Sequence, residues 1–310
     1  MNSTCFRCDA AKKERLRSLI TGAGACAVGF ARNHNADLSR LDSWIDSGMN
    51  GCLDYMTRNR HLRQNPAGLL EDCRTIVSIA FPYFRAGQPR SALFADYALG
   101  DDYHEVLRKI LAPVCQTIEE LMPGTATRIC VDSAPVLERQ WAVEAGVGFI
   151  GANRQLIVPG TGSKVFLCEI LWTAEVEPDA PCNLSCGNCG ACFKACPAAA
   201  LSEAGVDARR CLSCLTVELR DELPEDTTLK GRICGCDVCQ DVCPHNAAPP
   251  TALIAEFEPR PEILNLQGSQ IEPMTQEEFS ATFRHSTIKR LKLAGLKRNM
   301  RAKGNLKSEN

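Results

Sequence analysis

The sequence lacks a long apolar segment and has no excess of either charge. None of its apolar runs approaches the length of about 18 residues that a transmembrane helix needs. It contains 35 Lys and Arg against 37 Asp and Glu, so no global field draws it to a membrane or to nucleic acid. The first twenty residues are charged and contain no continuous apolar core, so we expect no secretory signal. These absences favour a cytoplasmic protein with no membrane association.

A dinucleotide-binding fingerprint is also missing. Gly22 and Gly24 lack the third glycine of such a motif, and they precede the nearest predicted strand instead of following it. Apart from two groups of cysteines, we find no internal repeat. At 310 residues, one large domain with a smaller one is the natural expectation.

Predicted strands and helices alternate up to about residue 175, which indicates an α/β (α+β) fold. Helices are predicted over residues 9–21, 101–122 and 135–145, and strands over 25–30, 74–84, 127–131, 155–158 and 165–172. A linker, EVEPDAPCN, leads into a cysteine-rich segment. Residues 276–303 are predicted to be helical, and from Arg284 to Lys303 there are eight Lys or Arg and no acidic residue. We therefore predict three parts, residues 1–178, 179–250 and 251–310.

Cysteine is the residue present in excess. There are 19 cysteines, and eleven of them lie between Cys182 and Cys243. A disulfide scaffold is usually short and secreted, whereas this chain is long and carries an odd number of cysteines. Clustered cysteines without a leader favour metal binding.

The spacing of these cysteines indicates two 4Fe–4S clusters. Cys186 to Pro197 matches the bacterial ferredoxin run C-x2-C-x2-C-x3-C-P, whose fourth cysteine ligates the other cluster. A second run of three cysteines ends at Cys243, and Cys211 can complete its set. The ligands predicted for the first cluster are Cys186, Cys189, Cys192 and Cys243. Those predicted for the second are Cys196, Cys211, Cys236 and Cys239. Cys182, Cys214 and Cys234 lie close enough in the chain to compete with Cys211. A structural zinc site is the alternative, although two Cys-Pro endings and a three-cysteine run fit it poorly.

Several motifs lie in order around this segment: GCLDYM at 51–56, ADYALGDDYHEVLRK at 95–109, the long stretch that begins VDSAPVLERQWAVEAG at 131, and GCDVCQDVCPHN at 235–246. Together they resemble the epoxyqueuosine reductase family over nearly the whole chain. The resemblance implies a nitroreductase-like cobalamin-binding domain, then a ferredoxin-like domain with two 4Fe–4S clusters and a short helical tail. It also implies that the oxidoreductase reduces epoxyqueuosine to queuosine in a tRNA with a GUN anticodon.

By this resemblance, cobalamin lies between Asp132 and the second cluster, and Asp132 donates a proton to the epoxide oxygen. A carboxyl group at an apolar cofactor face is expected to have a raised pKa and so to stay protonated. The alternative role for Asp132 is that of a helix N-cap before Pro135. The other residues expected at the cofactor are Arg63, Tyr97, Tyr103, His104, Asn153, Gly235, Cys236 and Asp237. For the aromatic residues the alternative is plain packing, and for Arg63 it is solvation.

The resemblance also suggests tRNA contacts after Cys211, at Thr216, Glu218 and Arg220. Clustered Lys and Arg in the tail fit an RNA backbone, or else a solvated helix face. An external electron donor such as flavodoxin or ferredoxin is implied, and a monomer is expected.

The chain departs from the family pattern at Ala152, Cys168, Cys214 and Cys234. Two alternatives therefore remain: a cobalamin-dependent reductase or reductive dehalogenase of a small molecule, and a non-catalytic iron–sulfur electron-transfer protein.

Overall fold

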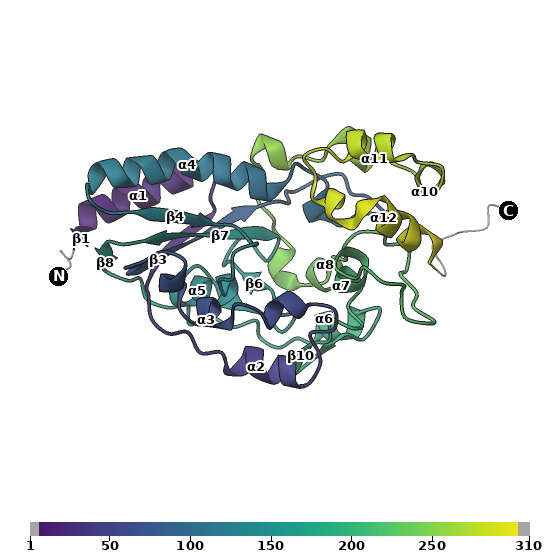
Figure 1. Cartoon of the computed structure of the whole chain (residues 1–310), viewed down its shortest axis with the longest axis horizontal. Coiled ribbons are helices and arrows are strands. Elements are labelled where there is room, and N and C mark those ends of the chain that lie inside the picture. Colours follow the sequence, from purple (N-terminus) through teal and green to yellow (C-terminus); the bar gives the residue numbers. More distant parts are fainter. Residues whose placement is uncertain (1–5, 303–310) are drawn as a thin grey trace.

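The computed structural model describes residues 6–302, and a four-stranded antiparallel sheet lies at its centre (Figure 1). The strand order is β2 (Ala27–Arg32), β3 (Thr75–Pro82), β7 (Val165–Trp172) and β4 (Thr127–Cys130). All eight residues of β3 are buried, because this central strand is covered on both faces. Its apolar, β-branched sequence suits that position.

Two long helices cover one face of the sheet, α1 (Ala10–Gly22) and α4 (Tyr103–Leu121) (Figure 1, top). Each begins at an aspartate whose carboxylate accepts a backbone N–H of the first turn: Asp9 from Lys12 and Asp102 from His104. Their apolar sides pack on alternate residues of β3 and β7, such as Ile79 and Ile170.

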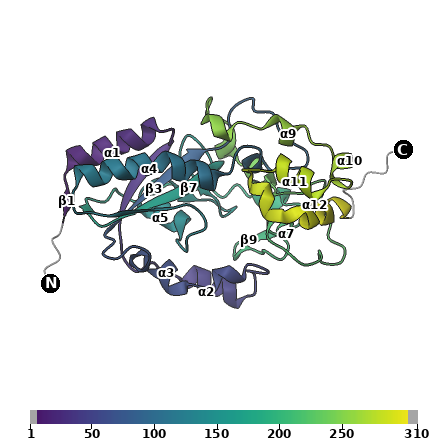
Figure 2. The ribbon, with the colours of Figure 1, turned by 45° about the horizontal axis from the view of Figure 1, so that its top comes forward.

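Smaller elements cover the other face. The helix α5 (Glu138–Glu144) buries Trp141 against β2 and β3, and the hairpin of β5 (Phe149–Ile150) and β6 (Leu156–Ile157) follows it. The helices α2 (Ser39–Asp46) and α3 (Arg60–Gln64) lie beyond α5 (Figure 2). At the N-terminal end, β1 (Arg7–Cys8) pairs with β8 (Glu175–Val176).

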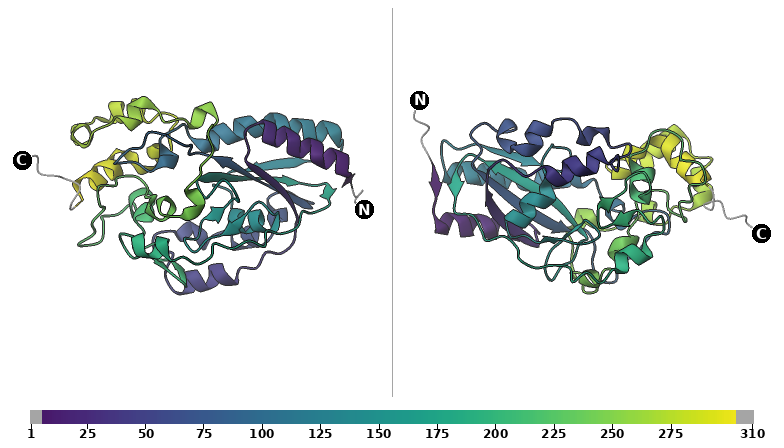
Figure 3. Two further views of the ribbon diagram at one scale, coloured as in Figure 1. Left: turned by 180° about the vertical axis from the view of Figure 1, so that it is seen from behind. Right: turned by 90° about the horizontal axis from the view of Figure 1, so that it is seen from below.

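The cysteine-rich segment forms short helices beside the sheet: α6 (Ala191–Ala195), α7 (Leu212–Val217) and α8 (Val238–Asp241). A hairpin of β9 (Leu201–Ser202) and β10 (Gly205–Val206) joins α6 to α7. The last part contains α9 (Pro261–Leu264), α10 (Gly268–Ile271), α11 (Gln276–Thr282) and α12 (Lys292–Arg301), with a 3-10 turn at Thr287–Leu291 (Figure 3).

Residues 93–99 connect the sheet to these later elements. Cys234 pairs with Phe94 in a β-bridge, and Ala95 donates its N–H to the carbonyl of Cys234 at 2.8 Å. Phe94 and Leu99 lie in one apolar core with Phe283 and Leu296 of the C-terminal part. This core packs the C-terminal helices beside the cysteine-rich segment, where they form one wall of the site described below.

The predicted α/β class and most of the predicted elements are confirmed. Two predictions need correction. The helix expected at 135–145 begins only at Glu138, because residues 132–137 form an irregular loop. The helix expected over 276–303 is broken near His285 and Lys292, both of which have positive φ, and Lys303 lies outside the described residues. Among residues 6–302, no helix is long and apolar enough to cross a membrane. The boundaries at 178 and 250 stay predictions.

Candidate functional site

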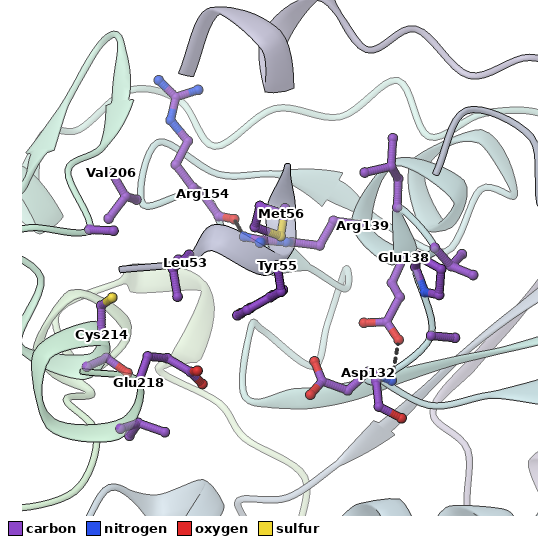
Figure 4. Close-up of a pocket in the computed structure, with 18 of the residues that line it drawn as sticks. Leu53, Tyr55, Met56, Asp132, Glu138, Arg139, Arg154, Val206, Cys214 and Glu218 are labelled. Carbon is purple, nitrogen blue, oxygen red and sulfur yellow. Dashed lines mark hydrogen bonds between the residues drawn. The ribbon is translucent and has the colours of Figure 1, made fainter. Parts of the chain in front are cut away.

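A pocket of about 2310 Å³ opens where the sheet domain, the cysteine-rich segment and the C-terminal part meet. Its volume is larger than that of a typical small-molecule site, about 300–1,000 Å³. Its walls come from distant parts of the chain, including Tyr55, Asp132, Glu138, Cys214 and Glu218 (Figure 4). Of the residues predicted at the cofactor, Arg63, Tyr97, Tyr103, His104 and Asp132 line it.

A smaller pocket of about 340 Å³ shares Asp132, Tyr97 and Tyr103 with the large one. All four cysteines predicted for the second cluster line it, as do Asn153 and Asp237. The structure therefore places Asp132 and the cysteines of the second group around one continuous cavity.

Asp132 lies just after β4, in the left-handed region at φ 50°. Non-glycine residues adopt this conformation infrequently, and it is common at functional sites. The Asp132 Oδ2 atom lies 3.1 Å from His104 Nε2, and His104 Nδ1 lies 2.7 Å from Asp102 Oδ1. The backbone N–H of Asp132 donates to Glu138 Oε1 at 2.7 Å (Figure 4). In this conformation the Asp132 carboxylate contacts His104 and does not cap α5.

The predicted protonation of Asp132 is wrong for this structure. Burial against the pocket walls acts to raise the pKa of Asp132, but the hydrogen bond and positive charge of His104 outweigh it, so the pKa lies below its ordinary value. Burial acts to lower the pKa of His104, and the hydrogen bonds and charges of Asp102 and Asp132 raise it to about 9. At neutral pH, the proton of this pair therefore resides on His104.

Two glutamates that the sequence analysis did not single out lie behind Asp132. Burial, followed by the negative charge of Asp132, raises the pKa of Glu138 to about 8. Burial and the charges of Glu138 and Asp132 raise the pKa of Glu169 well above its usual range. Glu138 lies inside a quoted motif, at the start of the predicted helix, and an acidic residue so close to Asp132 was the one sequence signal available.

The eight predicted cluster cysteines fall into two electrostatic groups that match the two predicted ligand sets. Burial is the main cause of the raised pKa of Cys192 and Cys243, and the neighbouring thiols that raise it further belong to the first set. Those that raise the pKa of Cys239 are Cys236, Cys211 and Cys196, all of the second set. Within residues 6–302, no three His, Cys, Asp or Glu side chains lie close enough to hold a single metal ion.

Two of the competing cysteines have other neighbours. The Sγ atom of Cys214 lies 3.7 Å from that of Cys52. Cys234 is fully buried, with Tyr97 beside its thiol. Cys168, another departure from the family pattern, is fully buried in β7.

Three of the predicted cofactor residues have local contacts that explain their identity. Arg63 is buried, donates to the carbonyl of Tyr55 at 3.1 Å, and leaves its Nε without a partner among the described residues. Asn153 donates to the carbonyl of Cys239 at 3.3 Å. Gly235 has φ 75°, and a Cβ there would lie 2.5 Å from the Cβ of Ala95, so the position requires glycine.

A buried charge network holds the second cysteine run against the sheet domain. Asp237 accepts the N–H of Asp96 at 2.7 Å. The ammonium group of Lys164 lies 2.5 Å from Asp96 and 2.7 Å from Asp241, and Arg90 also pairs with both aspartates. Asp237 therefore has a structural contact in addition to lining the small pocket.

The predicted RNA contacts divide into two kinds. Thr216 is 1% exposed and accepts the N–H of Gly235 at 3.0 Å, so the prediction of a direct RNA contact there is wrong for this conformation. Glu218 and Arg220 do line the large pocket, and Glu218 pairs with Arg290. The basic C-terminal segment also contributes to this wall, with four exposed side chains: Arg284, Lys289, Arg290 and Lys292.

Comparison with known proteins defines the class of this fold and site. Residues 63–133 match the family model for epoxyqueuosine reductase QueG, DUF1730, and residues 185–246 match a 4Fe-4S double cluster binding domain. The epoxyqueuosine reductase of Cellulophaga algicola is 34% identical over 307 residues, which cover 97% of this chain and 99% of that protein.

Two solved structures are similar over 93% of this chain and 79% of theirs. One is an epoxyqueuosine reductase with an epoxyqueuosine-modified tRNA-Tyr stem loop, at 30% identity and a TM-score of 0.83. The other is the Bacillus subtilis enzyme with its catalytic aspartate loop swung out of the active site, at 29% identity and a TM-score of 0.84. The fold and the site thus define an iron–sulfur oxidoreductase. The chain belongs to the epoxyqueuosine reductase family.

Proposed function

We propose that this protein reduces epoxyqueuosine to queuosine in the anticodon loop of a tRNA, with Asp132 as the immediate proton donor. The observation that carries the proposal is the shared cavity: Asp132 forms one side of it and the second group of four cysteines lines it too. A redox centre and a proton donor then flank one substrate position, as a reaction that takes up electrons and protons requires. Loss of the epoxide oxygen consumes two electrons and two protons and releases water.

We propose that cobalamin binds where the large pocket of about 2310 Å³ adjoins this smaller one, and when bound it would supply reduced cobalt as the source of the two electrons. The orphaned Nε of Arg63 is a buried donor for a polar substituent of such a cofactor. Gly235 lets the backbone beside the second cysteine group pack closely, and Asn153 fixes the Cys239 loop. Electrons would reach this position from the two iron–sulfur clusters, which an external donor such as flavodoxin or ferredoxin reduces in the cytoplasm.

The residues around Asp132 supply and hold the proton. His104 carries it in the resting state and is hydrogen-bonded to the Asp132 carboxylate, so His104 would first pass its proton to Asp132, which then donates it to the substrate. Asp102 holds the other imidazole nitrogen and so keeps the ring directed at Asp132. Tyr103 stacks on Phe166, with ring centroids 4.2 Å apart, and supports this end of the pocket.

The RNA is recognised at the mouth of the large pocket. The basic side chains at this mouth suit the phosphates of an unpaired anticodon loop, and the splayed bases of such a loop can enter a deep pocket. The tRNA-bound relative supports this substrate class.

Nucleoside mass spectrometry of tRNA tests the proposal. Cells without the gene should accumulate epoxyqueuosine; the wild-type gene should restore queuosine, and Asp132→Asn should not, although its protein should retain both clusters by iron analysis. Queuosine at normal levels in the deletion strain, with no redundant enzyme, would favour a small-molecule substrate. Purified protein without bound cobalamin after reconstitution would contradict the cofactor assignment.

A further inference from the structure

Glu138 has a contact that the proton-transfer roles do not use. Its side chain turns back from the first turn of α5, and Oε1 accepts the backbone N–H of Asp132 at 2.7 Å (Figure 4). Asp132 has φ 50°, in the left-handed region that side-chain-bearing residues adopt infrequently, although aspartate tolerates it better than most. An acceptor 2.7 Å from its amide nitrogen constrains the backbone at this position.

Other contacts of the same loop come from α4. Arg108 donates to Ser133 Oγ at 3.0 Å, and His104 contacts the Asp132 carboxylate. These bonds hold the side chains of the loop, whereas Glu138 holds the backbone of Asp132 from the opposite helix. The loop is thus held between α4 and α5.

We propose that Glu138 is a positioning residue that keeps the loop bearing Asp132 turned into the pocket. The inference rests on the proposed role of Asp132 only for its effect on turnover. In the Bacillus subtilis relative, the catalytic aspartate loop is swung out of the active site. Without the Glu138 acceptor, the left-handed backbone at Asp132 would lose a constraint and the loop would turn outward more often.

The charge on Glu138 should weaken this hold. The groups that face it are Asp132 on the loop, His104 and Tyr103 on α4, Arg139 on α5, Cys130 on β4, and Glu169 and Cys168 on β7. Burial and the Asp132 charge raise the pKa of Glu138 to about 8, so at neutral pH it is mostly uncharged. Above that pH, two adjacent carboxylates repel each other, and the inward loop becomes less favourable.

Hydrogen exchange at the Asp132 amide tests the proposal without a substrate. Glu138→Ala removes the acceptor, Glu138→Gln keeps an acceptor that cannot ionise, and Glu144→Gln on the same helix is the matched control. We expect the amide to exchange at least about tenfold faster in Glu138→Ala at pH 7, with kcat lowered at least about tenfold and KM little changed, because a displaced donor slows chemistry more than binding. Glu138→Gln and the control should match wild type.

The pH dependence provides a second readout. Relative to Glu138→Gln measured at the same pH, the wild-type amide should lose protection as the pH rises through about 8. Wild-type protection in a folded Glu138→Ala protein would overturn the proposal. If that variant does not fold, equal protection of wild type and Glu138→Gln from pH 6 to 9 would overturn it. Since exchange needs no tRNA, an inactive wild-type protein would count against the proposed function and leave this test intact.

Discussion

Acidic residues at the end of β4 differ in charge because their surroundings differ. Asp132 faces a protonated imidazole, which stabilises its carboxylate, whereas Glu138 and Glu169 lie behind it where burial opposes ionisation. Such a separation of pKa values among neighbouring acidic groups is typical of acid–base catalysis. The arrangement places a carboxylate and a protonated imidazole beside the substrate position and uncharged carboxyl groups behind them.

The proton on His104 gives a pH limit to turnover. The pKa of His104 is raised from 6.5 to about 9, so its imidazole stays charged at neutral pH and its charged pair with Asp132 is lost as the pH rises through about 9. We expect single-turnover rates of the wild-type enzyme to fall through about pH 9. His104→Gln should be slower at neutral pH and lack this step, while His34→Gln should keep it. A wild-type rate that is unchanged up to pH 10 would contradict the role of His104.

Glu169 is expected to cost stability at alkaline pH. It is fully buried, and neither carboxyl oxygen has a hydrogen-bond partner among the described residues. Because its folded pKa lies well above 4.5, the contribution of Glu169 to stability is most favourable below pH 4.5 and falls as the pH rises toward the folded pKa. Glu169→Gln should therefore raise the free energy of unfolding at pH 8 by about 1–3 kcal/mol relative to its effect at pH 4. Denaturant unfolding at both pH values measures this, with the exposed Glu277→Gln as control; equal effects at both would refute it.

Sequence reasoning singled out Asp132 by the resemblance and the eight cysteines by their spacing, and the role of each stays a prediction. It failed on the charge of Asp132. That charge depends on His104, which is 28 residues away and comes into contact only through the packing of α4 on the sheet. Glu138 was missed for a similar reason: its function as an acceptor depends on a backbone turn that no residue preference predicts.

At the scale of elements, the C-terminal segment separates into a binding surface and a structural support. Arg298 donates to the carbonyls of Leu219 at 2.8 Å and Leu215 at 3.2 Å, and so fastens α12 to the end of α7. Lys289 and Lys292 instead project from the break before α12 into the large pocket. The sequence pattern showed one basic stretch, and only the broken helix separates its two functions.

This division predicts different outcomes for two sets of variants. Lys289→Ala combined with Lys292→Ala should weaken the binding of an anticodon stem loop. It should also lower the slope of log Kd against log salt concentration by about 1.5. Its melting temperature should stay that of wild type. Arg298→Ala should lower the melting temperature and leave the salt slope unchanged. Fluorescence anisotropy over a range of salt concentrations measures the slope; an unaltered slope in the double variant would exclude a phosphate contact there.

At the scale of the whole molecule, the two cysteine runs are predicted to exchange one ligand each. Cys243 belongs to the second run in sequence and to the first group in space, while Cys196 shows the reverse. We expect Cys243→Ser and Cys186→Ser to lose the same electron paramagnetic resonance signal, and Cys239→Ser to lose the other. Each purified variant should retain about four of eight irons. If Cys243→Ser instead removed the signal that Cys239→Ser removes, the crossed assignment would be wrong.

The contact between Phe94 and the C-terminal core has a consequence for folding during synthesis. A ribosome makes Phe94 and Leu99 early, yet their apolar partners Phe283 and Leu296 come last. Until synthesis ends, the nascent chain exposes an apolar surface that chaperones and proteases recognise. A transcript truncated before codon 283 should therefore yield fragments that proteases degrade, and no incomplete enzyme that binds metal should accumulate.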